Sequence, residues 1–175
     1  GRARLRLSRS GWVGAAIVLV YVLVALTGPL WAPYEAAKIL TGSPFEGASL
    51  QHPFGTDNLG RDVFSRVVIG TRSVLAMTFA ATLLAVAVGG LIGVVLGYLR
   101  NWIDEIGMRI VDIFISIPTL VLALLIISGV GNSLWLVVVT VAFLFAPRVA
   151  RVARAATLNV VTNDYIAAAL ARGES

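Results

Sequence analysis

The chain has 175 residues, of which 58% are hydrophobic and 13% are charged, and its formal net charge is +5. Soluble domains usually carry about a quarter of charged residues, so this composition indicates an integral membrane protein. The absence of Cys excludes disulfides and thiolate metal sites, and the single His, His52, argues against a histidine-based metal cluster.

The first apolar run covers about residues 12–31 and follows a basic stretch of four arginines, Arg2, Arg4, Arg6 and Arg9. The uncharged stretch from Ser10 to Tyr34 is roughly twice the length of a signal-peptide core, so it predicts a retained membrane span. Because basic residues favour the cytoplasmic side, we expect residues 1–10 to be cytoplasmic and residues 11–32 to form the first transmembrane helix. Arginines clustered at membrane boundaries fit such anchoring better than nucleic-acid binding.

Residues 33–72 are polar and are predicted to lie outside the membrane, on the periplasmic or extracellular side. The stretch HPFGTDNLGRDVFSR within them begins with turn-forming residues and then becomes helical in pattern. Arg61, Asp62 and Arg66 have the spacing of a charge ladder on a short interfacial helix that leads into the second span. Oxygen ligands are too few and wrongly spaced for a metal-binding loop.

The second span is predicted over about residues 73–99. Gly89, Gly93 and Gly97 recur in it at intervals of four residues. Glycines at this spacing let two helix backbones approach closely in lipid, where no hydrophobic force drives the helices together. Helix packing within the chain is the favoured interpretation, and an interface with a partner subunit is the alternative.

The third span is predicted over about residues 110–130. Asp112 lies three residues after Arg109, so both side chains share one helix face and can form a structural ion pair. A functional role for this acidic residue near the membrane is the alternative. Pro118 removes a backbone hydrogen bond and is predicted to kink the helix, either as a static bend or as a hinge.

The fourth span is predicted over about residues 133–145, or through Arg148 if the helix continues past Pro147, and GVGNS joins it to the third span as a tight helical hairpin. Arg148, Arg151 and Arg154 then share one helix side, where lipid headgroups are the favoured contact. Four spans place the remaining residues in the cytoplasm. There, DYIAAALARG predicts a short helix with a small-residue face that suits docking against another protein.

The sequence contains no Walker A loop, no Ser/His/Asp set and no paired carboxylates. We therefore predict no catalytic, cofactor-binding or metal-binding residues. The chain is not expected to be an enzyme or to obtain energy from ATP by itself.

Three stretches together resemble a known family. HPFGTDNLGRDVFSRVVIGTRSVL, WIDEIGMRIVDIFISIPTLVLAL and DYIAAALARG are similar to segments of the inner-membrane permease subunits of ATP-binding-cassette (ABC) importers. The resemblance covers nearly the whole chain and is to the dipeptide/oligopeptide/nickel transport subfamily. The second stretch includes Arg109, Asp112 and Pro118.

The resemblance implies that Tyr165 to Gly173 begin a cytoplasmic coupling helix that docks on an ATPase subunit. Ala167, Ala168, Ala169 and Gly173 occupy the places of the family's E-A-A-x-x-x-G loop. Ala167 stands where that motif has Glu, so a salt bridge from this position is not expected. The small-residue docking face remains.

The implied fold is all-α, a polytopic transmembrane helical bundle of the type I ABC importer permease kind. Four spans are expected in this fragment and about six in the full protein, so residues 73–175 would be the N-terminal part of the permease domain. The implied location is the bacterial inner membrane. The implied partners are a second, related permease subunit, two ATPase subunits that bind ATP and Mg²⁺, an extracytoplasmic substrate-binding protein and membrane lipid, with no nucleic acid.

Peptide is the first expectation for the substrate, and nickel, glutathione or a sugar-like solute stays open. A non-transporting membrane scaffold is the alternative from another class. A secondary transporter is disfavoured because such proteins usually carry charges at mid-membrane depth, and the mid-span positions here are uncharged.

Overall fold

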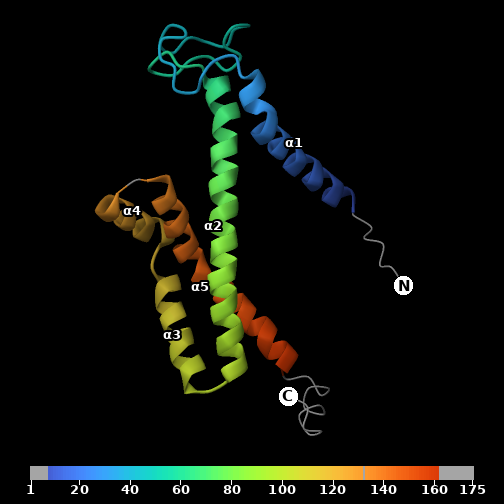
Figure 1. Cartoon of the computed structure of the whole chain (residues 1–175), viewed down its shortest axis with the longest axis vertical. Coiled ribbons are helices and arrows are strands. Elements are labelled where there is room, and N and C mark those ends of the chain that lie inside the picture. Colours follow the sequence, from blue (N-terminus) through green and yellow to red (C-terminus); the bar gives the residue numbers. More distant parts are fainter. Residues whose placement is uncertain (1–7, 132, 162–175) are drawn as a thin grey trace. The chain divides into compact units, whose positions relative to one another are not determined.

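The computed structural model describes residues 8–131 and 133–161, whose regular elements are helices (Figure 1). The chain divides into two compact units, Gly1–Ala76 and Met77–Ser175. The helices are α1 (Arg9–Trp31), α2 (Val63–Leu99), α3 (Trp102–Ser116), α4 (Thr119–Val130) and α5 (Leu134–Val161). The prediction of an all-α membrane protein is confirmed over these residues.

Helices α1, α2 and α5 are each long and apolar enough to cross a membrane. Helices α3 and α4 pass the same test only as a pair, and the chain bends by 85° between them. The described residues therefore contain three candidate spans, or four if the bent pair counts as one. The predicted third span is thus broken rather than continuous.

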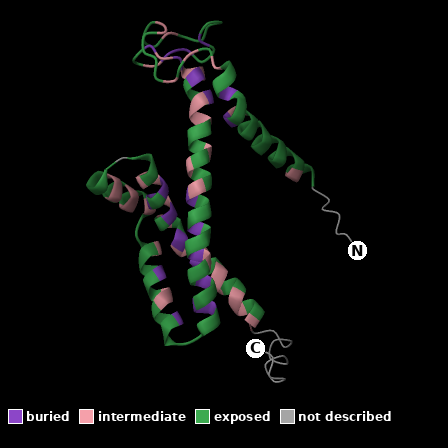
Figure 2. Ribbon diagram, viewed as in Figure 1, coloured by how far each residue is buried: buried purple, intermediate pink, exposed green. Residues whose placement is uncertain are grey.

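In the first unit, α1 begins after Ser8, whose hydroxyl accepts a hydrogen bond from the Gly11 amide at 3.2 Å. Most α1 side chains are exposed (Figure 2), as expected for a helix that faces lipid. Near its end, Gly28 packs against the start of α2, where a Cβ would lie 2.5 Å from the Val68 side chain. Glycine at this position permits the close contact.

The predicted interfacial helix does not exist as a separate element. Helix α2 begins at Val63 and runs without interruption through the predicted start of the second span near Ser73. Asp62 fixes this start of the helix, because its carboxylate caps the first turn and accepts a hydrogen bond from the Ser65 amide at 2.7 Å.

In the second unit, the predicted glycines of α2 face α5. A Cβ at Gly89 or Gly93 would collide with a backbone carbonyl of α5, and a Cβ at Gly97 would lie 2.9 Å from the Cβ of Thr157. Gly90, one residue away, faces open space. We call Gly89, Gly93 and Gly97 the glycine seam, and they allow the two helices to approach within backbone contact.

Helix α5 presents a matching stripe of small residues. Four of its five buried residues recur at intervals of four: Val138, Ala142, Ala146 and Ala150; the fifth is Thr140. The helix continues through Pro147 and Arg148, as the predicted extension allowed, and ends at Val161. Small side chains on both helices explain why the contact is close along its length.

The bend between α3 and α4 lies at the predicted proline. Ile117 is extended (φ −78°, ψ 131°), the conformation that a following proline favours, and α4 begins immediately after Pro118. Pro118 therefore separates two helices, a larger effect than the predicted kink within one span.

Candidate functional site

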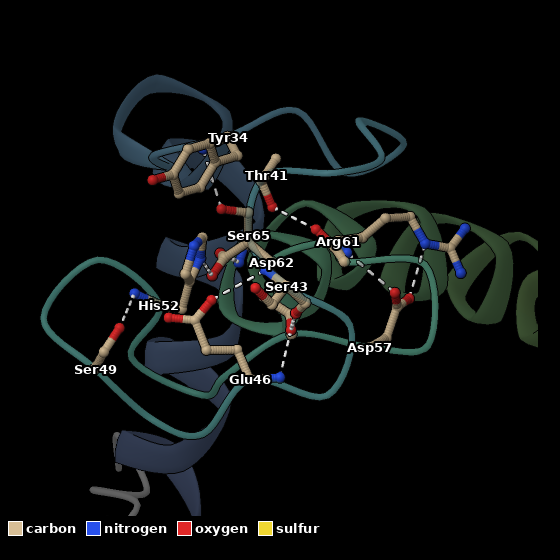
Figure 3. A network of polar contacts seen from close by, with 12 residues as sticks. Tyr34, Thr41, Ser43, Glu46, Ser49, His52, Asp57, Arg61, Asp62 and Ser65 are labelled. Atoms are coloured by element: carbon tan, nitrogen blue, oxygen red, sulfur yellow. Dashed lines mark hydrogen bonds and ion pairs between the residues drawn. The ribbon is translucent and has the colours of Figure 1, made fainter.

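The connection between α1 and α2, residues 32–62, folds around a buried His–Asp pair (Figure 3). His52 Nδ1 lies 3.0 Å from Asp62 Oδ1, and the two residues are only 1% and 2% exposed. The His52 ring stacks on Tyr34 at a centroid distance of 5.2 Å. The Tyr34 amide donates a hydrogen bond to the Ser65 hydroxyl at 3.1 Å, so the end of α1 is tied to the start of α2.

The Asp62 carboxylate stays ionised inside this pair. Burial alone would raise its pKa, but hydrogen bonds from Ser65 and His52 outweigh burial and hold the pKa of Asp62 below its usual value. An ionised carboxylate can only accept hydrogen bonds, so the Nδ1 atom of His52 is the donor. This arrangement satisfies both buried groups and fixes the first turn of α2.

A second carboxylate, Asp57, organises the turn before α2. It accepts hydrogen bonds from the Leu59 amide at 2.9 Å, the Arg61 amide at 3.1 Å and Arg61 Nε at 2.8 Å, and it pairs with the Arg66 guanidinium. Burial opposes ionisation, but these backbone and side-chain hydrogen bonds prevail and lower the pKa of Asp57 to about 2.

The predicted ladder of Arg61, Asp62 and Arg66 is therefore wrong. Both arginines bind Asp57, while Asp62 turns inward to His52. The turn at Gly60, which has φ of +66°, separates Arg61 from the helix and makes this arrangement possible.

Thr56 ties the remaining loop together. Its hydroxyl accepts a hydrogen bond from the Glu46 amide at 2.9 Å and donates one to the Ser43 carbonyl at 2.5 Å. Leu40 and Phe45 have positive φ values of 56° and 55°, which bulky residues rarely adopt, and both side chains are exposed. The polar network holds the backbone of this loop in a conformation that its local sequence does not favour.

In the second unit, the three arginines of α5 reach α3 and α4 rather than pointing only to lipid headgroups. Arg148 donates a hydrogen bond to the Thr119 hydroxyl at 2.6 Å, and Arg151 pairs with Asp112. Arg154 binds Asp104 through two hydrogen bonds of 2.5 and 2.6 Å.

The predicted ion pair between Arg109 and Asp112 does not form. Arg109 lies 3.4 Å from Glu105, one turn earlier on the same helix, and Asp112 is engaged by Arg151. A Glu four residues before a basic residue is a favourable arrangement, and α5 supplies a competing cation for Asp112. Sequence reasoning could not detect this partner, because 39 residues separate Asp112 from Arg151.

An apolar cavity of about 340 Å³ lies between α2, α3 and α5 in the second unit. Its lining includes Val88, Ile92, Phe114 and Phe143 and contains no charged side chain. Among the described residues, no group of three or more His, Cys, Asp or Glu side chains could hold a metal ion. The predicted coupling residues Tyr165, Ala167, Ala168, Ala169 and Gly173 lie outside the described residues.

These features define a multi-pass helical membrane protein, and comparison with known proteins narrows the class. Residues 2–53 match the family model described as the N-terminal TM domain of oligopeptide transport permease C. Residues 89–175 match the model described as the binding-protein-dependent transport system inner membrane component. The chain belongs to this family of ABC permeases, in its dipeptide/oligopeptide subfamily.

Individual relatives agree with this assignment. The chain is 32% identical to a dipeptide transport system permease protein of Alkalihalophilus pseudofirmus, over 97% of this chain and 56% of the relative. It is 30% identical to a dipeptide transport system permease protein of Haemophilus influenzae, over 95% of this chain and 58% of the relative. It is 34% identical to a glutathione transport system permease protein of Escherichia coli, over 98% of this chain and 57% of the relative. The chain thus spans little more than half the length of these relatives.

Proposed function

We propose that the protein containing this chain is a permease subunit of an ATP-driven, binding-protein-dependent importer of di- or oligopeptides. The observation that carries the proposal is the similarity of more than nine-tenths of the chain to permeases named for dipeptide and glutathione transport. Glutathione is itself a tripeptide, so these names share one class of substrate. Nickel or another small solute is the alternative within the same subfamily.

In this proposal, the helices of the second unit form part of one half of the translocation pathway. A second, related permease forms the other half, two ATPase subunits bind ATP and Mg²⁺, and an extracytoplasmic binding protein delivers the substrate. The chain itself holds no cofactor. Residues 1–10 and those after α5 face the cytoplasm, which accords with the arginines at these two places.

Residues Tyr165 to Gly173 act as the coupling helix in this proposal. They come three residues after α5 in the sequence, since α5 ends at Val161. Coupling between ATP hydrolysis and transport requires a docking site that is distinct from the pathway and an assembly with two conformations. A small-residue face from Ala167 to Ala169 provides such a docking surface.

The test is transport by the full-length permease, assembled with its partner subunits in liposomes that are supplied with the binding protein. We expect ATP-dependent uptake of a radiolabelled dipeptide that unlabelled tripeptides reduce and nickel does not. Ala169→Arg should abolish uptake while ATP hydrolysis continues, and Ala169→Ser is the matched control that keeps a small side chain. Normal uptake by Ala169→Arg would exclude this docking role. If the unaltered assembly binds its partners but transports no peptide, the result would favour the non-transporting scaffold.

A further inference from the structure

Helix α5 has two different contact faces within the second unit. One face carries Ala146 and Ala150 against the glycine seam of α2. The other carries the three arginines that reach α3 and α4. If these contacts are rigid, a displacement of α5 moves α2 on one side and the α3–α4 segment on the other.

The contact between Arg154 and Asp104 is the most sheltered of the arginine contacts. The Asp104 side chain is 8% exposed and that of Arg154 is 29% exposed, whereas those of Arg151 and Asp112 are 50% and 58% exposed. A sheltered pair is screened less by water and salt than an exposed one. The Asp104 pair is thus the strongest polar connection between α3 and α5.

Its geometry fixes orientation as well as distance. The Nε and Nη2 atoms of Arg154 each donate to a different oxygen of Asp104. Two parallel hydrogen bonds of this kind hold the guanidinium and carboxylate in one plane, which a single Lys ammonium cannot do. At the same level, the backbone amide of Arg154 faces Gly93, where a Cβ would lie 2.9 Å away.

Position along the chain gives this pair a particular role. Arg154 lies in the last third of α5, beside the glycine seam, where a Cβ at Gly97 would lie 3.1 Å from the Arg154 carbonyl oxygen. Asp104 lies in the first turn of α3. Asn101 caps this helix, and its side chain accepts a hydrogen bond from the Ile103 amide at 3.0 Å. The pair therefore joins the cytoplasmic part of α5, in the proposed orientation, to the start of the bent α3–α4 segment.

We propose that Asp104 and Arg154 are positioning residues that transmit movement of the coupling segment through α5 to α2 and α3 together. The inference rests on the proposed function and adds the residues through which the coupling travels. Neither residue touches substrate or nucleotide in this scheme. Their effect is on the number of substrate molecules imported per ATP hydrolysed.

The experiment measures peptide uptake and ATP hydrolysis by the same full-length reconstituted assembly. We expect Asp104→Asn and Arg154→Gln each to lower uptake per ATP by about tenfold while hydrolysis persists. Arg154→Lys, which keeps the charge but not the paired hydrogen bonds, should give an intermediate loss. The double charge exchange Asp104→Arg with Arg154→Asp should restore most of the ratio. Asp112→Asn, at the exposed pair, is the matched control and should change the ratio less than about twofold.

A purely structural role would lower the amount of assembled transporter and leave uptake per ATP unchanged in the fraction that assembles. That result, or a loss at Asp112→Asn as large as at Asp104→Asn, would overturn the inference while leaving the proposed function intact. Failure of the unaltered assembly to import peptide would instead remove the proposed function and this inference with it. Where a single variant fails to assemble, Arg154→Lys and the charge exchange provide the same comparison.

Discussion

The loop of residues 32–62 and the helices of the second unit are stabilised in opposite ways. The loop buries charged and polar groups, above all His52 and Asp62, and satisfies them with specific hydrogen bonds. The second unit brings helices together at glycine and alanine residues, with ion pairs beside the contact rather than inside it. The comparison shows that a membrane helix pair needs small residues, whereas an irregular segment without a large apolar core needs a polar network.

The largest expected effect is the loss of the buried pair in the loop. Asp62→Ala removes the cap of α2 and leaves the His52 donor buried without a partner, so it should destabilise the first unit by about 3 kcal/mol. Hydrogen exchange of the amides in residues 41–60 measures this change. Glu35→Ala removes an exposed carboxylate from the same loop and is the matched control. Equal protection in Asp62→Ala and the unaltered protein would contradict the role given to the pair.

The second effect concerns the glycine seam. Gly93→Ala places a Cβ against a backbone carbonyl that cannot move without displacing α5, so it should destabilise the second unit by about 1–3 kcal/mol. Gly90→Ala is the control, because its Cβ enters open space and alanine favours helix. Thermal unfolding of the purified full-length protein in detergent compares the two. A Gly93→Ala protein as stable as Gly90→Ala would show that the helices do not approach closely here.

A smaller effect is the response of the loop to acid. The pKa of Asp57 falls from 3.8 to about 2 in the folded loop. A lowered pKa means that the stabilisation is complete above about pH 4 and is lost as the pH falls towards 2. Amide exchange at Leu59 and Arg61, corrected for intrinsic rates, should therefore increase only below pH 4. Asp57→Asn should remove this pH dependence, and loss of protection already at pH 6 in the unaltered protein would argue against an ionised Asp57 as its cause.

The smallest effect concerns Arg109, which pairs with Glu105 in the structure but was predicted to pair with Asp112. Arg109 and Glu105 are largely exposed, so their coupling energy should be about 0.3–0.5 kcal/mol. A double-mutant cycle with Arg109→Ala and Glu105→Ala measures it by thermal unfolding. The same cycle with Asp112→Ala should give a coupling near zero, and a larger value for Asp112 than for Glu105 would reinstate the predicted pair.

The sequence was sufficient for those features that depend on local pattern. Apolar runs predicted the membrane spans, although α2 and α3 begin earlier than expected, at Val63 and Trp102. Glycines at intervals of four residues marked the packing face of α2 but not its partner α5, and Pro118 marked the break between α3 and α4. The 85° bend between α3 and α4 is larger than the predicted kink, because nothing in the local sequence reveals how far two helices diverge after a break. The continuation of α5 through Pro147 was expected as an extension of the fourth span, and the helix ends at Val161.

Pairings between distant residues could not be predicted. Asp104 lies 50 residues from Arg154, and neither carries a local signal that selects the other. His52 was interpreted only as a poor metal ligand, because its burial with Asp62 depends on how a turn-rich segment folds. The Asp57 turn was missed for a related reason, since the helical spacing of Arg61, Asp62 and Arg66 favoured a ladder that the turn at Gly60 prevents.

The central claim is that this chain connects an ATPase to a membrane pathway, and a cross-link tests it most directly. The chain contains no Cys, so Ala169→Cys in a full-length background without other cysteines provides a single reactive site. We predict a cross-link to an ATPase subunit whose yield changes when ATP is added, and none from Ala37→Cys in the loop proposed to lie on the opposite side of the membrane. An Ala169→Cys protein that is folded and reactive from the cytoplasm, yet forms no cross-link with or without ATP, would contradict the account.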